Sequence, residues 1–286
     1  MNIQWYPGHM TKAKRMMAEN IALVDIIIEL LDSRIPLSSQ NPEIERLAKG
    51  KPRIVVLNKT DMSDPTATAQ WLAYYRSKGL AAVGVDAITG KGVSQITDEA
   101  RRIMQPKLER SQARGRISRP IRAMIAGIPN VGKSTLINKL VGKAATKTAD
   151  RPGVTRGKQW IRIVKDLELL DTPGLLWPKF DDKRVGLYLA FTGAINDQII
   201  DIVELSLELI ATLLIKAPGA LEARYKIEIS NEDTNLDILE KIATVRGFRL
   251  KGGVLNLERT AITLIDEFRA ARLGRITLEL LGDIDA

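Results

Sequence analysis

Short apolar runs alternate with amphipathic stretches along the chain as far as residue 170. The runs have the length of buried strands, and the stretches between them show the three- and four-residue spacing of helices. We expect strands at residues 25–31, 53–57, 80–85, 121–126, 160–164 and 167–170, helices at 9–23, 65–78, 93–110 and 133–140, and a loop at 32–42. Strands that alternate with helices predict a mostly parallel sheet with helices on both faces.

The pattern changes after residue 178. Residues 185–217, 235–245 and 260–273 have helical spacing and little strand character. We therefore predict two domains: an α/β domain at residues 1–178 and a small all-α C-terminal domain at residues 179–286.

The composition excludes several classes of protein. The 286 residues contain no cysteine and a single histidine, His9, which rules out disulfides, thiolate metal sites and zinc sites built from several histidines. No apolar run approaches the roughly 20 residues that cross a bilayer, and the first residues lack the pattern of a signal peptide. We expect a soluble cytoplasmic protein with no membrane partner.

The charge is uneven along the chain. The net charge is +9, and residues 181–286 hold 13 Lys and Arg against 18 Asp and Glu, which leaves +14 for residues 1–180. Residues 101–122 alone hold eight Lys or Arg and one Glu, as a basic connector would. This clustering favours a polyanionic partner such as nucleic acid over an ordinary solvated surface, which stays the alternative.

A phosphate-binding loop is indicated at residues 127–134, which read Gly-Ile-Pro-Asn-Val-Gly-Lys-Ser. The pattern G-x-x-x-x-G-K-[ST] lies between a predicted strand and a predicted helix, where backbone N–H groups and the helix N-terminus attract phosphate. Lys133 is expected at the β- and γ-phosphates, Ser134 on Mg²⁺ and Thr135 at the α-phosphate. A glycine-rich turn is the alternative. The nucleotide-binding candidates here are Asn130, Val131, Gly132, Lys133, Ser134 and Thr135.

The run Asn58-Lys59-Thr60-Asp61 follows the second predicted strand and resembles the NKxD motif of translation-factor-like GTPases. Guanine presents two adjacent N–H donors, and the Asp61 carboxylate can accept both, whereas adenine would leave it unsatisfied. The resemblance implies that Asn58 supports the base and its loop and that the Lys59 stem lies along the ring. A plain polar turn is the alternative.

A second base-contacting loop is indicated at Asp86-Ala87, after the third predicted strand. It resembles the loop whose backbone N–H touches guanine O6 in GTPases. Many relatives carry Ser where this chain has Asp86, while the contact from Ala87 comes from the backbone.

The run that follows the sixth predicted strand, Asp-Thr-Pro-Gly, resembles the DxxG motif. By that resemblance Asp171 holds a Mg²⁺-bound water and the Gly174 N–H senses the γ-phosphate. Upstream, a stretch that resembles the first switch offers Thr155 as a second hydroxyl for Mg²⁺, with Thr146 and Thr148 as alternatives. A simple turn is the alternative for the Asp-Thr-Pro-Gly run, and its spacing from the phosphate loop argues against it.

These motifs occur in a permuted order, because the NKxD run precedes the phosphate loop. The chain resembles the bacterial ribosome biogenesis GTPase A family of circularly permuted P-loop GTPases. The resemblance is carried by residues 5–10, 32–39, 127–134, 171–178 and 189–195.

The resemblance implies hydrolysis of GTP to GDP and phosphate with Mg²⁺, stimulated by the ribosomal subunit. It also implies a role in late maturation of the large ribosomal subunit, contact with its ribosomal RNA through the C-terminal domain, and no DNA partner. Two alternatives are a signalling GTPase that binds only proteins and a scaffold that holds nucleotide without hydrolysing it.

Two further residues carry specific hypotheses. Leu175 stands where many GTPases place the glutamine that orients the attacking water. His9 is therefore the candidate catalytic residue, with a helix-capping or RNA-contacting histidine as the alternative. Asn130 resembles the residue of potassium-activated GTPases that helps to place K⁺, with stabilisation of the loop alone as the alternative.

Overall fold

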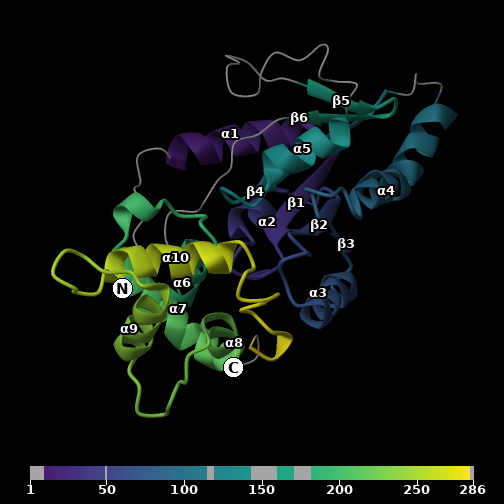
Figure 1. Cartoon of the computed structure of the whole chain (residues 1–286). Helices are drawn as coiled ribbons and strands as arrows, with labels where there is room; N and C mark the ends of the chain where they lie inside the picture. Colours follow the sequence, from purple (N-terminus) through teal and green to yellow (C-terminus); the bar gives the residue numbers. More distant parts are fainter. Residues whose placement is uncertain (1–9, 49, 115–118, 143–159, 171–181, 284–286) are drawn as a thin grey trace.

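The computed structural model describes residues 10–48, 50–114, 119–142, 160–170 and 182–283 (Figure 1). Its sheet has six strands in the order β3-β2-β1-β4-β6-β5. The strands are β1 Ile26–Asp32, β2 Arg53–Asn58, β3 Ala81–Gly84, β4 Ile121–Gly127, β5 Trp160–Val164 and β6 Leu167–Leu170. All neighbours are parallel except β5 and β6, so the predicted mostly parallel sheet is confirmed.

Helices cover both faces of this sheet, as predicted. The helices of this part are α1 Met10–Leu23, α2 Pro42–Ala48, α3 Pro65–Ser77, α4 Val93–Ala113 and α5 Lys133–Val141. Side chains alternate along a strand, so Ile26, Ile28 and Leu30 of β1 pack in the core shared with α4 and α5. Ile27 packs with α1 and α2 on the other face, and Leu31 packs there with α3.

Two local predictions differ from the structure. The pattern predicted a loop at residues 32–42 and no helix directly after it, whereas the structure has helix α2 there. Its short length leaves only Ile44 and Ala48 as buried residues, which is too few for a clear helical spacing. The basic stretch predicted as a connector at residues 101–122 is helical as far as Ala113, so much of its charge is displayed by α4.

The second part of the chain is helical, and Figure 1 shows it at one end of the molecule. It contains α6 Lys183–Phe191, the 3₁₀ turn η2 Asp197–Ile199, α7 Ile202–Lys216, α8 Ala220–Tyr225, α9 Asn235–Arg246, α10 Leu257–Arg269 and the 3₁₀ turn η3 Leu281–Asp283. The apolar stretch predicted at residues 185–217 is broken at Gly193, whose φ of +77° ends α6. None of the described helices is long and apolar enough to span a membrane.

The two parts share one hydrophobic core, which extends from the α4 face of the sheet into α6, α7, α9 and α10. After α10 the chain returns to the α/β part, where the Leu278 N–H donates to Arg34 O at 2.8 Å. The predicted domain boundary falls in residues 171–181, outside the described residues. The segment 275–279, which that division assigns to the helical domain, nevertheless packs on the α/β part.

Candidate functional site

The candidate residues gather where the parallel strands end. NKxD follows β2, Asp86 follows β3, and the phosphate loop follows β4. Because the carboxyl ends of parallel strands meet at one edge of a sheet, segments far apart in sequence come together there.

Two glycines give the phosphate loop its shape. Gly132 has a φ of +99°, and a Cβ on it would lie 2.4 Å from Asn58 Nδ2. A Cβ on Gly127 would lie 2.6 Å from Leu30 O in the neighbouring strand. Side chains at either position would therefore push the loop away from β1 and β2, which explains physically why the pattern requires glycine at both ends.

The Lys133 side chain lies within the curl of the loop. It is buried, and its Nζ donates to Gly127 O at 3.1 Å and to Ile128 O at 2.5 Å. Ser134 and Thr135 are exposed in the first turn of α5, where the partial positive charge of the helix N-terminus favours an anion. A buried cation, a helix N-terminus and an inward-curled backbone together fit a nucleotide phosphate chain.

Asn58 joins three of the candidate segments. Its Nδ2 donates to Val131 O at 2.8 Å, and its Oδ1 accepts from the Ala87 N–H at 3.1 Å. The side chain is 3 % exposed. One amide therefore holds the phosphate loop, the NKxD run and the second base-contacting loop in a fixed arrangement. In this arrangement the Ala87 N–H expected at guanine O6 is directed at Asn58.

Lys59 and Asp61 have different surroundings. Lys59 has a φ of +62°, an uncommon conformation outside glycine. Its Nζ forms an ion pair with Asp32 Oδ2 at 2.9 Å. Asp61 is exposed, and its carboxylate makes no hydrogen bond with the part of the chain that the structure describes, so it is accessible to a base.

Asp86 organises its own loop. Its Oδ1 accepts from the Ile88 N–H at 2.9 Å and the Thr89 N–H at 3.2 Å, and its Oδ2 accepts from the Thr89 hydroxyl. Burial acts to raise the pKa of Asp86, but these hydrogen bonds outweigh it and hold the pKa below its usual value. The Asp86 side chain therefore serves to close the turn.

Asp32 and Arg34 have roles that the sequence did not predict, although the stretch that contains them carries part of the family resemblance. Both are buried, and Arg34 binds Asp32 through two parallel hydrogen bonds of 2.9 and 2.8 Å. Burial acts to raise the pKa of Asp32, but Arg34 and Lys59 outweigh it and hold the pKa far below its usual value. Arg34 Nη1 also donates to Arg269 O at the end of α10, at 3.2 Å. The signal in the sequence was an apolar strand that ends in two charged residues separated by one serine.

Asn130 connects the phosphate loop to the helical part. It has a φ of +55°, and its Nδ2 donates to Gly193 O at 2.7 Å. A cavity of about 560 Å³ opens between these two segments, lined also by Asp197 and Arg269. Arg269 spans the helical side of this cavity by binding both Asp197 and the Phe191 carbonyl.

The γ-phosphate side of the candidate site lies outside the described residues, which exclude His9, Thr155, Asp171, Gly174 and the alternatives Thr146 and Thr148. Within the described residues no group of three or more His, Cys, Asp or Glu side chains could hold a metal ion. Of the three predicted Mg²⁺ ligands, the structure therefore describes Ser134 alone.

Known proteins match this chain over most of its length. A family model described as "50S ribosome-binding GTPase" matches residues 122–240. The chain is 46% identical to ribosome biogenesis GTPase A of Priestia megaterium over 98% of this chain and 97% of that protein. It is 30% identical to the protein of that name from Thermotoga maritima, over 99% and 96% of the two chains.

Solved structures agree with these matches. The GDP-bound structure of T. maritima YlqF aligns with a TM-score of 0.66 at 25% identity, over 94% of this chain and 100% of that one. The GNP-bound YlqF structure from T. maritima aligns with a TM-score of 0.65 at 26% identity, over 94% and 98%. The fold is therefore that of a circularly permuted P-loop GTPase. The chain belongs to the ribosome biogenesis GTPase A family and is a GTP-hydrolysing enzyme that binds guanine nucleotide.

Proposed function

We propose that this ribosome biogenesis GTPase is a molecular switch that docks on the RNA of the large ribosomal subunit and acts late in the assembly of that subunit. The description of the matching family model, a 50S ribosome-binding GTPase, supports this choice of particle. So does a similarity that extends over nearly the full length of its relatives.

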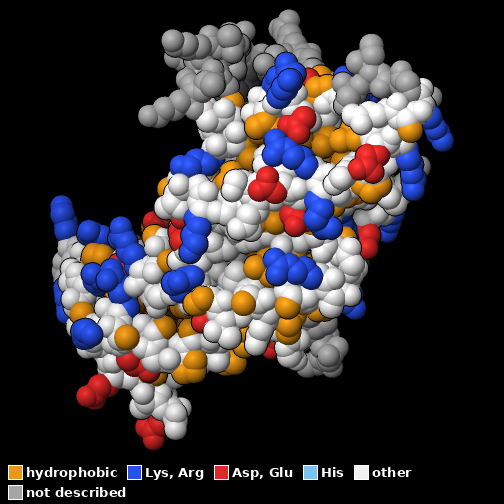
Figure 2. Space-filling model, turned by 90° about the vertical axis from the view of Figure 1, so that its right-hand side faces the viewer, with side chains coloured by type: hydrophobic (Ala, Val, Ile, Leu, Met, Phe, Trp, Pro, Cys, Tyr) orange, Lys and Arg blue, Asp and Glu red, His pale blue; other side chains and the backbone are white. Residues whose placement is uncertain are grey.

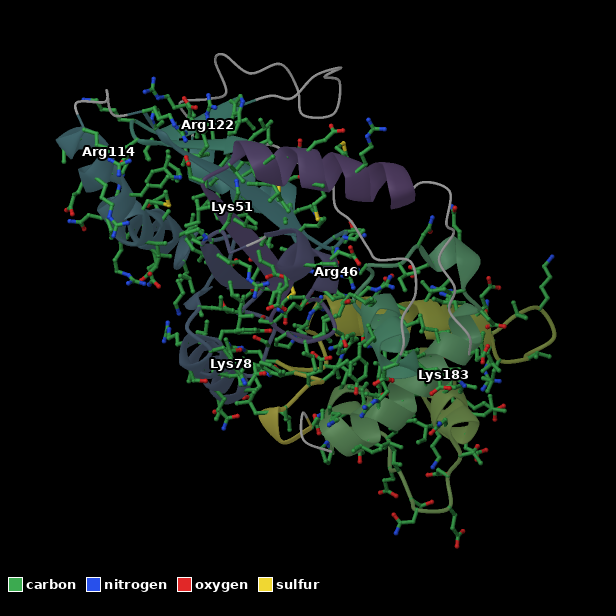
Figure 3. All side chains as sticks on the ribbon, turned by 180° about the vertical axis from the view of Figure 1, so that it is seen from behind. Arg46, Lys51, Lys78, Arg114, Arg122 and Lys183 are labelled. Atoms are coloured by element: carbon green, nitrogen blue, oxygen red, sulfur yellow. The ribbon has the colours of Figure 1, made fainter. Side chains whose placement is uncertain are left out.

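The observation that carries the RNA contact is a basic surface at the end of the molecule formed by α4 and the start of β4. Arg110 and Arg114 are exposed at the end of α4 and form no ion pair with other described residues. Figure 3 shows Arg114 at the same end of the molecule as Arg122. Figure 2 shows further Lys and Arg side chains, interspersed with Asp and Glu, on the face turned toward the viewer. A polyanionic backbone binds such a surface by releasing its counterions.

Ion pairing neutralises this basic surface only in part. Lys107 and Arg119 share the carboxylate of Asp25, at 2.9 and 2.8 Å, so two cations meet one acid. Arg122 lies 3.8 Å from Glu168 and stacks over the Trp160 ring at 4.6 Å. The side chains of Lys107 and Arg119 are 63% and 56% exposed, which leaves them accessible to phosphate.

In the proposed site Lys133 binds the β- and γ-phosphates and Asp61 reads the base. Ser134, Thr155 and Asp171 would hold Mg²⁺, which offsets the negative charge of the phosphates. The Gly174 N–H would report the γ-phosphate. The loss of its contacts on hydrolysis is the usual origin of a GTPase switch.

Binding of the protein to purified large subunits tests this function. Sedimentation of the complex with a non-hydrolysable GTP analogue, with GDP and without nucleotide should give the strongest binding in one state. Binding should also weaken steeply as salt increases, because the contact is to phosphate. A protein that never sediments with the subunit, yet hydrolyses GTP, would favour the alternative of a signalling GTPase with protein partners only.

Charge reversal tests the basic surface. Arg114→Glu should reduce the affinity for the large subunit by about tenfold and lower the dependence on salt, since it removes one phosphate contact and adds a repulsion. Lys78→Glu is the matched control, because Lys78 lies on the α3 side, away from Arg114 (Figure 3), and its substitution changes the charge equally. Equal affinities of both variants would argue against RNA docking through α4.

A further inference from the structure

The chain beyond α10 lies across the loops that follow β1 and β2. Gly274, with a φ of +113°, turns the chain away from the helical part. The four residues Ile276, Thr277, Leu278 and Glu279 are 7%, 4%, 0% and 8% exposed. We call residues 275–279 the strap. The burial of these four residues shows that they are an integral part of the α/β surface, while the Arg275 side chain is exposed at the start of the strap.

The strap makes four contacts with residues 59–64, the segment after β2 that we call the guanine-recognition loop. Arg275 donates from Nη2 to Thr60 O at 2.6 Å and from Nε to Ser63 O at 2.9 Å. The Ile276 N–H donates to Met62 O at 3.2 Å. The fourth contact is made by Thr277 Oγ1, which accepts from the Asp64 N–H at 3.1 Å. Thus every residue of the loop from 60 to 64, except Asp61, is held through its backbone by the strap.

These contacts fix the backbone from which the Asp61 side chain extends. The Thr60 carbonyl belongs to the same planar peptide unit as the Asp61 N–H, so a donor that holds this oxygen also sets the plane from which Asp61 starts. Arg275 holds the carbonyl groups on both sides of Asp61 with one rigid guanidinium. The loop has no helix or strand of its own, and Lys59 enters it at a φ of +62°. Its own turn is closed by one hydrogen bond, from the Met62 N–H to Lys59 O at 2.9 Å, so the contacts from the strap do much to define its shape.

The far end of the strap is anchored firmly. The Glu279 carboxylate accepts from the Leu37 N–H at 2.6 Å and from the Ser38 N–H at 3.0 Å. The Trp71 indole donates to Glu279 O at 2.8 Å. Because Trp71 is fully buried, the strap is tied to the core behind the loop. Because its far end is anchored in this way, the strap can keep Arg275 in a fixed position against the loop.

We infer that Arg275 is a positioning residue for guanine recognition: it holds the loop so that both oxygens of Asp61 meet the two N–H donors of the base. The inference rests on the proposed role of Asp61. It adds a specificity-determining contact that comes from the C-terminal segment, more than 200 positions away along the chain.

Comparison of GDP with inosine diphosphate isolates this effect. Inosine lacks the exocyclic amine of guanine, so the ratio of the two affinities measures the hydrogen bond from that amine to the carboxylate. A charge-assisted hydrogen bond of this kind is worth about tenfold to a hundredfold in affinity. The ratio does not depend on the fraction of protein that is folded, since both ligands bind the same molecules.

In the full chain, Arg275→Ala should lower the ratio of GDP affinity to inosine diphosphate affinity about threefold to tenfold relative to the parent. The reason is that a poorly positioned Asp61 carboxylate forms a weaker hydrogen bond with the exocyclic amine. Arg275→Lys should give an intermediate ratio, since an ammonium lacks the planar fork that spans two carbonyls. Arg272→Ala is the matched control: Arg272 is an exposed arginine three positions earlier and should leave the ratio unchanged.

The outcomes separate this inference from the role of Asp61. Asp61→Asn should lower the ratio, and an unchanged ratio in that variant would refute the role of Asp61 and the inference with it. If Asp61→Asn lowers the ratio while Arg275→Ala weakens both ligands equally, Arg275 is merely structural and the inference is wrong. Should Arg275→Ala fail to fold, Thr277→Val decides in its place, because it removes only the acceptor for Asp64; an unchanged ratio there and in Arg275→Lys overturns the inference.

Discussion

Asn58 shows how one side chain can set the geometry of a whole site. Its amide bonds to the phosphate loop on one side and to Ala87 on the other, while the absence of a side chain at Gly132 leaves room for it. The motif predicted that Asn58 supports the base and its loop. It did not predict the contact with Val131, because that contact needs β2 and β4 to end at the same edge of the sheet.

A first prediction concerns the effect of potassium on the rate of GTP hydrolysis. Asn130 donates through Nδ2 to Gly193, so its Oδ1 is left to accept from another group or to coordinate a cation. A potassium ion placed there would offset the charge that develops on the phosphates, as an arginine finger does. We expect faster GTP hydrolysis in potassium than in sodium buffer of equal ionic strength, and Asn130→Ala should abolish the difference. Equal rates of the parent in the two buffers would leave Asn130 with a loop-stabilising role.

A second prediction concerns the activation of water. Leu175 cannot orient a water molecule, and His9 is the single histidine of the chain. We expect His9→Ala to keep its affinity for GDP and to lose the hydrolysis rate stimulated by the ribosomal subunit, which single-turnover measurements with and without subunits would show. His9→Gln is a useful comparison, since a glutamine can orient water without accepting its proton. A variant stimulated as strongly as the parent would favour the helix-capping or RNA-contacting alternative.

The connection from β3 to α4 determines where the second base-contacting loop lies. The backbone pairs Asp86 with Lys91 before α4 begins. Gly92 then turns the chain at a φ of +79°, where a Cβ would lie 2.2 Å from Gly84 O. The strand, the turn and the helix therefore depend on a close backbone approach that only glycine permits.

Gly92→Ala should push the start of α4 away from the end of β3. The left-handed conformation alone costs about 1–2 kcal/mol for a residue with a side chain, and the contact with a backbone oxygen adds to that cost, since neither atom can move independently. We expect a loss of more than about 2 kcal/mol in the free energy of unfolding, together with weaker binding of GDP. Urea unfolding and titration with GDP measure both.

Gly79→Ala is the control for this prediction. Gly79 has a similar φ of +77° and nothing within 4 Å of an added Cβ. It should therefore show the conformational cost alone, about 1–2 kcal/mol, with unchanged nucleotide binding. Identical losses of stability in the two variants would mean that the approach to Gly84 has no energetic importance.

In the complete fold, the candidate nucleotide site belongs to the α/β part, and the helical part is joined to that part at separate points. Asn130 meets Gly193, Arg34 meets the end of α10, and the strap crosses the guanine-recognition loop. We therefore expect a ligand that displaces the helical part to change nucleotide affinity, and by linkage nucleotide binding to change the placement of that part.

The buried Glu279 makes this packing sensitive to pH. Burial raises the pKa of Glu279 to about 7, although the hydrogen bonds that its carboxylate accepts from Ser38 and Leu37 act to lower this pKa. The folded protein therefore binds this proton more tightly than the unfolded chain, so the contribution to stability is present at low pH and is lost as pH rises through about 7. Glu29, whose pKa is also raised by burial to about 7, acts in the same direction.

Glu279→Gln should remove the part of the pH dependence that is due to Glu279. Between pH 5.5 and pH 8 we expect the free energy of unfolding of the parent to fall by about 2 kcal/mol more than that of the variant. Urea unfolding at the two pH values measures this. Glu232→Gln, a change at an exposed glutamate of the helical part, should keep the slope of the parent. Parallel pH profiles of the parent and Glu279→Gln would contradict the assignment.

The strands, most of the helices, the glycine-rich loop and the permuted order of the motifs could be predicted from the sequence alone. These features depend on spacing along the chain, on strand-length apolar runs, and on residues such as Gly132 and Lys133 whose chemistry is local. Helix α2 escaped prediction because its two buried residues make too weak a pattern. No pattern along the chain predicts that Asp32 and Arg34 support Lys59, that Asp86 closes a turn, or that Arg275 reaches Thr60 and Ser63. Contacts of this kind join residues from different elements, and they exist only once the sheet and the shared core have brought the chain together.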